Sequence, residues 1–204
     1  MITIIDYGVG NLRSVQKAIE YLGYKVQISS EASVIKKAQL LILPGQGAFS
    51  EAMKNLERTE LVPYIKEFLQ DNRPFLGICV GFQILFEESY EHGTHKGLGV
   101  FKGCVKKFAS RDHEIPHMGW NTIEINQDKN GIFQNLKEKS FTYFVHSYYV
   151  ETSQTELIST TTNYAGIDFT SSIQKENLLA TQFHPEKSGK VGLEILSNFF
   201  RRSL

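Results

Sequence analysis

Residues 74–89 read PFLGICVGFQILFEES, and this segment decides the class of fold. Residues 75–78 form a short, continuous apolar run, which is typical of a strand that is buried on both faces of a sheet. The chain is predicted to enter a helix at Val80, directly after this strand. A buried strand that leads straight into a helix is the repeating unit of an α/β protein with a parallel sheet.

The first half of the chain repeats this unit. Further strands are predicted at residues 2–5, 25–28 and 40–43. Helices are predicted between the strands, at residues 14–22, 49–56 and 61–69. Strands that alternate with helices form parallel sheets with helices on both faces, so we expect a mainly parallel central sheet in a flavodoxin-like three-layer arrangement.

The second half is richer in strands. Turn residues separate predicted strands at residues 100–107, 122–125, 142–145, 157–161, 167–173 and 178–183. Short strands joined by turns predict an antiparallel β extension of the sheet, followed by a helix over residues 191–202. No internal repeat or long linker interrupts the 204 residues, so a single domain over residues 1–204 is expected.

Composition narrows the range of functions. Lysine and arginine total 22, and aspartate and glutamate also total 22, so charge gives no reason to expect nucleic acid or an anionic membrane as a partner. The apolar run at residues 75–86 is shorter than the roughly 20 residues of a membrane-spanning helix. The N-terminus lacks a signal-peptide pattern, and two cysteines do not make a disulfide framework. These features predict a cytoplasmic protein.

Cys79 stands between two glycines at the predicted turn from strand to helix. The sequence Gly77-Ile78-Cys79-Val80-Gly81 is the cysteine counterpart of the G-x-S-x-G turn that exposes a nucleophile. Flanking glycines relieve the crowding of such a turn, and the N–H of Val80, at the start of the helix, is free to donate to an oxyanion. A cysteine in an apolar run more often serves packing alone, so the pattern leaves a structural and a catalytic role open.

A second motif, His184-Pro185-Glu186, supplies what a cysteine nucleophile needs. The nucleophile requires a general base, and the base requires a third group that holds its tautomer and orientation. Pro185 disfavours the helical region for His184, and in extended chain residues two apart point to the same side, so Glu186 can reach the imidazole. A lone histidine is more often structural, but its combination with Cys79 favours catalysis.

The two motifs together resemble the class I (triad) glutamine amidotransferases. The resemblance is carried by residues 77–83, GICVGFQ, and by residues 184–186, HPE. It implies that Cys79 attacks the side-chain amide of glutamine to form a thioester, that His184 acts as base and acid, and that Glu186 orients His184.

Residues 43–49, LPGQGAF, resemble the oxyanion loop of the same family. The resemblance implies a backbone N–H donor, assigned to Gln46, that works together with the N–H of Val80. Gly45 and Gly47 on either side permit unusual backbone angles. They are also predicted to leave the loop incomplete until a partner docks.

Further segments resemble one branch of the family, the glutaminase subunits of imidazole glycerol phosphate synthases. They are residues 6–12 (DYGVGNL), 115–121 (IPHMGWN), 143–149 (YFVHSYY) and 187–188. The resemblance places four residues at the glutamine site, Gln83, His146, Ser147 and Tyr148. A dinucleotide fingerprint fails because Arg13 stands where a third glycine is required, so no cofactor is expected. No metal site is expected, since Pro116 lies between His113 and His117, and since His92 and His95 stand in a glycine-containing turn.

The same resemblance implies a partner, a separate (β/α)8-barrel cyclase in a heterodimer. The cyclase uses the ammonia to make imidazole glycerol phosphate and AICAR in histidine biosynthesis. A glutaminase that worked alone would waste glutamine and release its ammonia to water, which also favours a partner. The residues predicted at the docking face are Asn11, Trp120, Tyr143 and Lys187.

Three alternatives stay open at this point. The chain is also compatible with a glutaminase paralogue that feeds another synthase, and with a cysteine hydrolase or peptidase of related architecture. A non-catalytic scaffold is the third, although the presence of Cys79, His184 and Glu186 argues against it.

Overall fold

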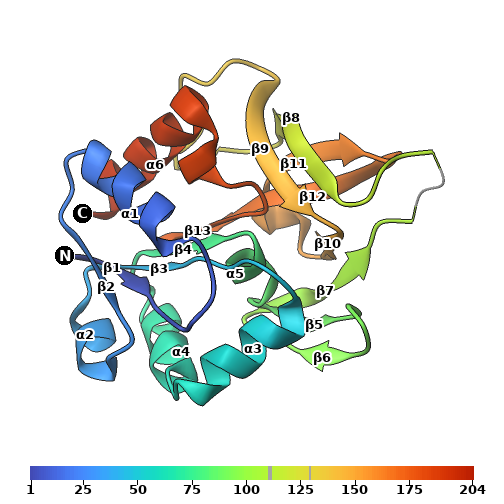
Figure 1. Cartoon of the computed structure of the whole chain (residues 1–204). Coiled ribbons are helices and arrows are strands. Elements are labelled where there is room, and N and C mark those ends of the chain that lie inside the picture. The colour runs from blue at the N-terminus through green and yellow to red at the C-terminus, as the bar shows by residue number, and fades with distance from the viewer. Residues whose placement is uncertain (110–111, 129) are drawn as a thin grey trace.

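The computed structural model describes residues 1–109, 112–128 and 130–204. Within these residues thirteen strands form one sheet, which runs through the middle of the molecule (Figure 1). Parallel neighbours in its first part are, in order, β2 (Val26–Ser29), β1 (Ile2–Ile5), β3 (Leu40–Leu43), β4 (Phe75–Ile78) and β13 (Leu178–Thr181). The parallel central sheet predicted from the alternation of strands and helices is therefore confirmed.

Helices cover both faces of this parallel part (Figure 1). On one side lie α1 (Leu12–Tyr21) and α6 (Gly189–Ser203), and on the other lie α3 (Phe49–Arg58) and α4 (Val62–Gln70), with α2 (Ala32–Lys37) beside them. The start of α1 is fixed by Asn11, whose side chain accepts a hydrogen bond from the Ser14 N–H at 3.2 Å. The predicted three-layer arrangement is confirmed. No helix in the described ranges is long and apolar enough to cross a bilayer.

The predicted antiparallel extension is also present. β12 (Ile167–Lys175) pairs antiparallel with β13 and continues the sheet. Beyond it lie β10 (Tyr148–Glu151), β7 (Phe101–Lys107), β5 (Phe86–Ser89) and β6 (His95–Lys96). These neighbours pair antiparallel, except that β5 runs parallel to β7. A branch consists of β11 (Ile158–Tyr164), β8 (His117–Ile125) and β9 (Ser140–His146).

The helix predicted from Val80 is shorter than expected. Only one turn forms, α5 (Val80–Gln83), and the chain then enters β5. Backbone pairing explains the early end, because the N–H groups of Leu98 and Val100 donate to the carbonyls of Ile84 and Leu85 at 2.7 and 2.8 Å. The carbonyls that would continue the helix are therefore used by a neighbouring segment.

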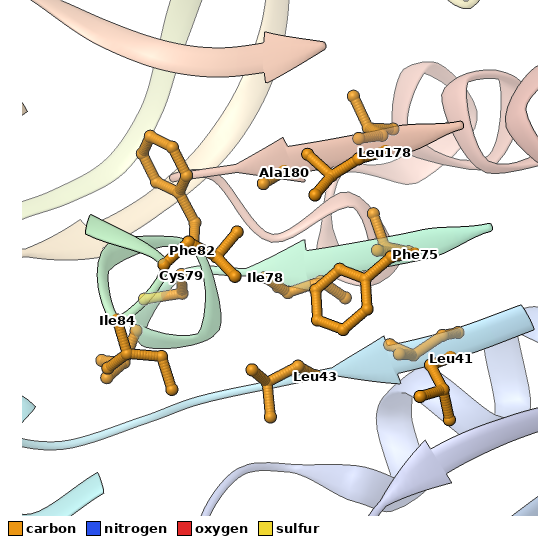
Figure 2. Close-up of a cluster of buried hydrophobic side chains, with 14 of the residues drawn as sticks. Leu41, Leu43, Phe75, Ile78, Cys79, Phe82, Ile84, Leu178 and Ala180 are labelled. Atoms are coloured by element: carbon orange, nitrogen blue, oxygen red, sulfur yellow. The ribbon is translucent and has the colours of Figure 1, made fainter. Parts of the chain in front are cut away.

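The core surrounds the carboxyl end of β4. Figure 2 shows Cys79 directly after this strand, among the side chains of Leu43, Ile78 and Phe82. β3, β4 and β13 are buried along their whole length. Ligands of parallel sheets bind where the strands end, so this edge is the place to look for a site.

Candidate active site

The turn after β4 places Cys79 in a strained backbone conformation. Its φ is 55° and its ψ is −111°, a region that costs a non-glycine residue roughly 1–3 kcal/mol. The flanking glycines are required by space, since a Cβ on Gly81 would lie 1.9 Å from the Leu43 carbonyl oxygen and one on Gly77 would lie 3.0 Å from the Gly81 carbonyl oxygen. The N–H of Cys79 donates to the Thr181 carbonyl at 2.8 Å, which ties the turn to β13.

β13 leads directly to the histidine and the glutamate. His184 is extended, and Pro185 then begins the one-turn 3-10 helix η2 (Pro185–Lys187). The Nδ1 atom of His184 lies 2.8 Å from Glu186 Oε1, and both side chains are 2% exposed. Because a carboxylate only accepts, we assign the proton to Nδ1, which leaves Nε2 of the neutral ring as a proton acceptor.

The electrostatics of His184 favour the charged ring. Burial lowers its pKa, but the negative charge of a Cys79 thiolate and the hydrogen-bonded carboxylate of Glu186 raise it, and the net shift is upward. His184 Nε2 is buried and has no hydrogen-bond partner within the described ranges. His184 can therefore carry its positive charge directly beside Cys79, and a cysteine attacks a carbonyl carbon when a charged histidine stands next to its sulfur.

One cavity of about 350 Å³ brings the predicted residues together. Its lining comprises Gln46, Gly47, Cys79, Val80, Gln83, Glu91, Pro116, Val145, His146, Ser147, Tyr148 and His184. Gly45 and Glu186 are not in the lining: Gly45 lies against the turn after Cys79, and Glu186 holds His184 from behind. In the part of the chain that is described, no cluster of three or more histidine, cysteine, aspartate or glutamate side chains is arranged to hold a metal ion.

The predicted oxyanion loop lies against the turn after Cys79. A Cβ on Gly45 would lie 2.5 Å from the Gly81 nitrogen, so glycine is needed at position 45 for close approach rather than for an unusual φ. Gly47, in contrast, has a φ of 84°. The Tyr7 hydroxyl donates to the carbonyl of Pro44 at 2.6 Å. The loop is thus held closely at its first half, and positive φ is confined to its second.

Two residues that the sequence did not single out also support the loop. Burial and the nearby negative charge of a Cys79 thiolate raise the pKa of Tyr7 above its usual range, so its hydroxyl stays a donor to Pro44. Glu91 accepts from the Phe49 N–H at 2.6 Å and lines the cavity. Tyr7 does lie inside the family-like segment 6–12, but Glu91 had no such signal.

The polar side chains beneath the cavity form one connected network. Gln83, predicted as a substrate contact, donates from Nε2 to the Tyr148 carbonyl at 3.0 Å and to Gln182 Oε1 at 2.9 Å. His146 Nδ1 lies 2.8 Å from the same carbonyl, and its Nε2 lies 2.9 Å from Nδ1 of His117. Gln83 and His146 therefore have structural partners as well as a place in the cavity wall.

The histidine pair predicts acid-sensitive stability. Burial lowers the pKa of His117 to about 4 and that of His146 to about 3, the latter with a smaller contribution from the charges of His117 and His184. Unfolded histidines titrate near pH 6.5, so below that pH the unfolded chain binds protons, whereas the two folded histidines stay neutral. The free energy of unfolding should fall from about pH 6.5 to pH 4, by up to ~1.4 kcal/mol per pH unit for each histidine.

Urea unfolding between pH 4.5 and 7 measures this slope. His117→Gln should flatten it, whereas the exposed His92→Asn should leave it as in the unaltered chain. His184 adds no slope below about pH 6, where it is charged in both states. Toward pH 7 the unfolded histidine loses its proton while the folded one, whose pKa is raised, keeps it, so its contribution there opposes that of the pair. Equal slopes in all three chains would contradict the assignment.

Three of the four predicted docking residues lie together. Trp120 on β8 is paired with Tyr143 on β9, with ring centroids 6.1 Å apart, and Lys187 Nζ lies 6.0 Å from the Tyr143 ring. Asn11 is the cap of α1, a helix whose Ser14 lines a shallow pocket together with Glu186.

The β8–β9 pair presents an exposed apolar face. Alternate residues of a strand share a face, so Met118 and Trp120 of β8 lie on the same side as Phe141 and Tyr143 of β9. Met118, Trp120 and Phe141 are 63%, 56% and 56% exposed. Val145, which lines the cavity, is the next residue along this face. We call these five residues the ribbon face, and it borders the cavity.

Comparisons with known proteins agree with this geometry. The family model "Glutamine amidotransferase class-I" matches residues 3–203. "Imidazole glycerol phosphate synthase subunit HisH" of Aquifex aeolicus is 49% identical over 98% of this chain and 96% of its own length. The subunit of the same name from Geobacter metallireducens is 45% identical over 97% and 96%. Among solved structures, PurLQS from Thermotoga maritima shares the fold, with a TM-score of 0.77 at 17% identity over 98% of this chain and 97% of that one. The chain therefore belongs to the class-I glutamine amidotransferases, and within them to the family of HisH subunits.

Proposed function

We propose that this chain is the glutaminase subunit of an imidazole glycerol phosphate synthase. It hydrolyses glutamine to glutamate and ammonia, and it passes the ammonia to a (β/α)8-barrel cyclase that makes imidazole glycerol phosphate and AICAR in histidine biosynthesis. The observation that carries the proposal is the position of Cys79 and His184 on one small cavity, with Glu186 hydrogen-bonded behind the histidine. Residues 1–204 act as one domain, and we assign the chain to the cytoplasm.

The cavity supports the following reaction. The Cys79 thiolate attacks the carbon of the glutamine side-chain amide and forms a tetrahedral intermediate whose oxygen carries the negative charge. His184 gives its Nε2 proton to the amide nitrogen, the carbon–nitrogen bond breaks, and ammonia leaves a thioester behind. His184 then takes a proton from water as the water attacks the thioester, the carbon–sulfur bond breaks, glutamate leaves, and the thiolate and the imidazolium are restored. Glu186 keeps the imidazole in one tautomer throughout.

The oxyanion requires backbone donors near Cys79. The N–H of Val80 stands at the first position after the nucleophile, and that of Gln46 stands in the loop that packs on the same turn. Both residues line the cavity. Each donor typically contributes ~10²–10³-fold in rate.

The remaining lining fits glutamine rather than a peptide. A volume of about 350 Å³ suits one small molecule, whereas a peptidase requires an open groove for extended chain. Glu91 supplies a carboxylate in the cavity for the ammonium group of the amino acid. Gln83, Ser147 and Tyr148 supply amide, hydroxyl and backbone groups for its polar atoms.

We place the cyclase on the ribbon face and on Lys187. Exposed aromatic residues with a cation nearby are the composition of protein interfaces. The catalytic residues are directly connected to this surface, because the His184 N–H donates to the Tyr143 carbonyl and the Ser188 hydroxyl accepts from the Tyr143 N–H. Docking at Tyr143 thus acts on the backbone that positions the base, and we propose that docking also completes the oxyanion loop between Gly45 and Gly47.

Titration of the chain with the barrel cyclase, with glutamate as the readout, tests the function and the surface together. Hydrolysis should rise and saturate as cyclase is added. Trp120→Ala should raise the half-saturating concentration by roughly 30-fold, the effect of losing an aromatic residue worth about 2 kcal/mol. Tyr21→Ala, which removes an exposed aromatic residue at the far end of α1, is the matched control and should not shift it.

Each outcome has a distinct meaning. Absence of glutamate at every cyclase concentration would overturn the glutaminase. Rapid glutamine hydrolysis whose rate does not change with cyclase concentration would favour a paralogue that serves another synthase. Equal effects of Trp120→Ala and Tyr21→Ala would remove the ribbon face as the docking site.

A further inference from the structure

Gln182 is a buried amide that the reaction above does not use. It follows the last residue of β13, two positions before His184, and it is completely buried. Its backbone N–H donates to the Ser171 carbonyl at 2.8 Å, which fixes the residue in the sheet. Its side-chain nitrogen Nε2 lies 3.8 Å from the sulfur of Cys79.

The direction of this amide can be worked out from its neighbours. The Tyr148 carbonyl can only accept, so the Gln83 atom that lies 3.0 Å from it must be the nitrogen. The second hydrogen of that nitrogen points to Gln182 at 2.9 Å, so the Gln182 atom there must be the oxygen. The other end of the Gln182 amide is therefore its nitrogen, and it presents an N–H group to Cys79.

The histidines at the other end of the network also hydrogen-bond to the Tyr148 carbonyl, through His146. His146 donates from Nδ1 to the Tyr148 oxygen, which fills its second acceptor position. His146 Nε2 then accepts from His117 Nδ1, and His117 Nε2 accepts from the Asn121 side-chain nitrogen at 3.2 Å. Each nitrogen and oxygen in the series from Asn121 to Tyr148 can therefore act only as a donor or only as an acceptor. All the hydrogen bonds of the series run in one direction, toward the Tyr148 carbonyl.

We infer that Gln182 contacts the nucleophile directly and that its side-chain N–H, aimed by Gln83 and the Tyr148 carbonyl, stabilises the thiolate of Cys79. The inference rests on the proposed role of Cys79 as the nucleophile. It adds a group from outside the Cys79, His184 and Glu186 set that acts on the reacting sulfur before glutamine binds.

The backbone carbonyl next to the sulfur acts in the opposite sense. The Val145 carbonyl lies 4.0 Å from the Cys79 sulfur, and a carbonyl can only accept the proton of a neutral thiol. The Gln182 N–H can only donate, so it favours the negative sulfur. Without Gln182 the balance between these two groups shifts toward the thiol.

Alkylation of Cys79 by iodoacetamide as a function of pH measures this balance. The chain has two cysteines, so Cys104→Ser leaves Cys79 as the single reactive thiol. In that background Gln182→Leu should raise the midpoint of the alkylation profile by about one pH unit, which lowers the alkylation rate roughly tenfold below the midpoint. Gln182→Glu keeps the shape and the acceptor for Gln83 but places an oxygen at the sulfur, and it should raise the midpoint at least as far.

Gln174→Leu is the matched control. Gln174 is also buried, but it lies on β12 opposite Leu179, toward the other end of β13 from Gln182. It should leave the midpoint unchanged. The kinetics of glutamine hydrolysis with the cyclase give a second readout, in which Gln182→Leu should lower kcat roughly tenfold and change KM little, because the thiolate acts in the chemical step.

An unchanged midpoint in Gln182→Leu, or an equal shift in Gln174→Leu, would overturn the inference. If Gln182→Leu does not fold, the isosteric Gln182→Glu decides the question by the same profile. Failure of the proposed glutaminase is recognised separately, since a chain with intact Gln182 would then release no glutamate, whereas its alkylation profile would still report on the amide.

Discussion

The Cys79→Ala variant, in complex with the cyclase, should lose glutamine-dependent synthesis and keep synthesis from an added ammonium salt. Without the sulfur no thioester can form, and loss of the nucleophile of such a triad lowers kcat on the order of 10⁶-fold. The fold should tolerate the change, because alanine meets the same positive φ as cysteine and removes a single atom from the core around β4. Product formation with glutamine and with ammonium, measured side by side, gives the result.

Cys104→Ser is the matched control for this variant. Cys104 lies on β7 and does not line the cavity, so both activities should persist. Loss of ammonium-dependent synthesis in Cys79→Ala would show that the residue is needed for assembly rather than for chemistry. Retention of glutamine-dependent synthesis would exclude Cys79 as the nucleophile.

Gly81→Ala should lower kcat for glutamine hydrolysis by roughly 10²–10³-fold, the typical loss of one oxyanion donor. The added Cβ would lie 1.9 Å from the Leu43 carbonyl oxygen and 3.3 Å from the Pro44 carbonyl carbon, and both atoms belong to backbone. Either the loop or the turn after Cys79 must therefore move. Helix propensity alone predicts that Gly81→Ala is harmless or stabilising, because alanine is favoured over glycine inside a helix by about 1 kcal/mol.

Gly23→Ala separates loss of activity from loss of stability. Gly23 has a φ of 85°, but a Cβ there would meet no atom within 4 Å. Gly23→Ala should lower the melting temperature through backbone strain and leave kcat unchanged. If Gly81→Ala keeps full activity, the loop does not depend on close contact with the turn, and its proposed part in catalysis is wrong.

The parallel half of the fold was predictable because its strands are buried on both faces. β1, β3 and β4 are apolar at nearly every position, and this is visible without any knowledge of neighbours. The end of α5 was not predictable in the same way. Residues 82–86 are all buried, so their pattern fits a helix as well as a strand, and the pairing with Leu98 and Val100 decides between them.

The residues of the candidate site also differ in how far the sequence predicts them. Cys79, His184 and Glu186 carry their chemistry in short motifs, so spacing and residue type were enough to bring them into one hypothesis. The direction of the Gln182 amide depends on Gln83 and on the backbone carbonyl of Tyr148, two residues that are distant from it in the sequence. Sequence spacing contains no information about such a long-range chain of partners.

The register between β4 and β13 has a consequence for the order of assembly. Thr181 pairs with Ile78, and this one pairing sets Cys79 beside the segment that carries His184. β13 inserts between β4 and β12 although it is the last strand in the chain, and such distant pairings form slowly. Until that insertion Cys79, the proposed nucleophile, lacks the proposed base, so we expect that a nascent or partly folded chain does not hydrolyse glutamine. Glutamine hydrolysis therefore indicates that β13 has paired with β4.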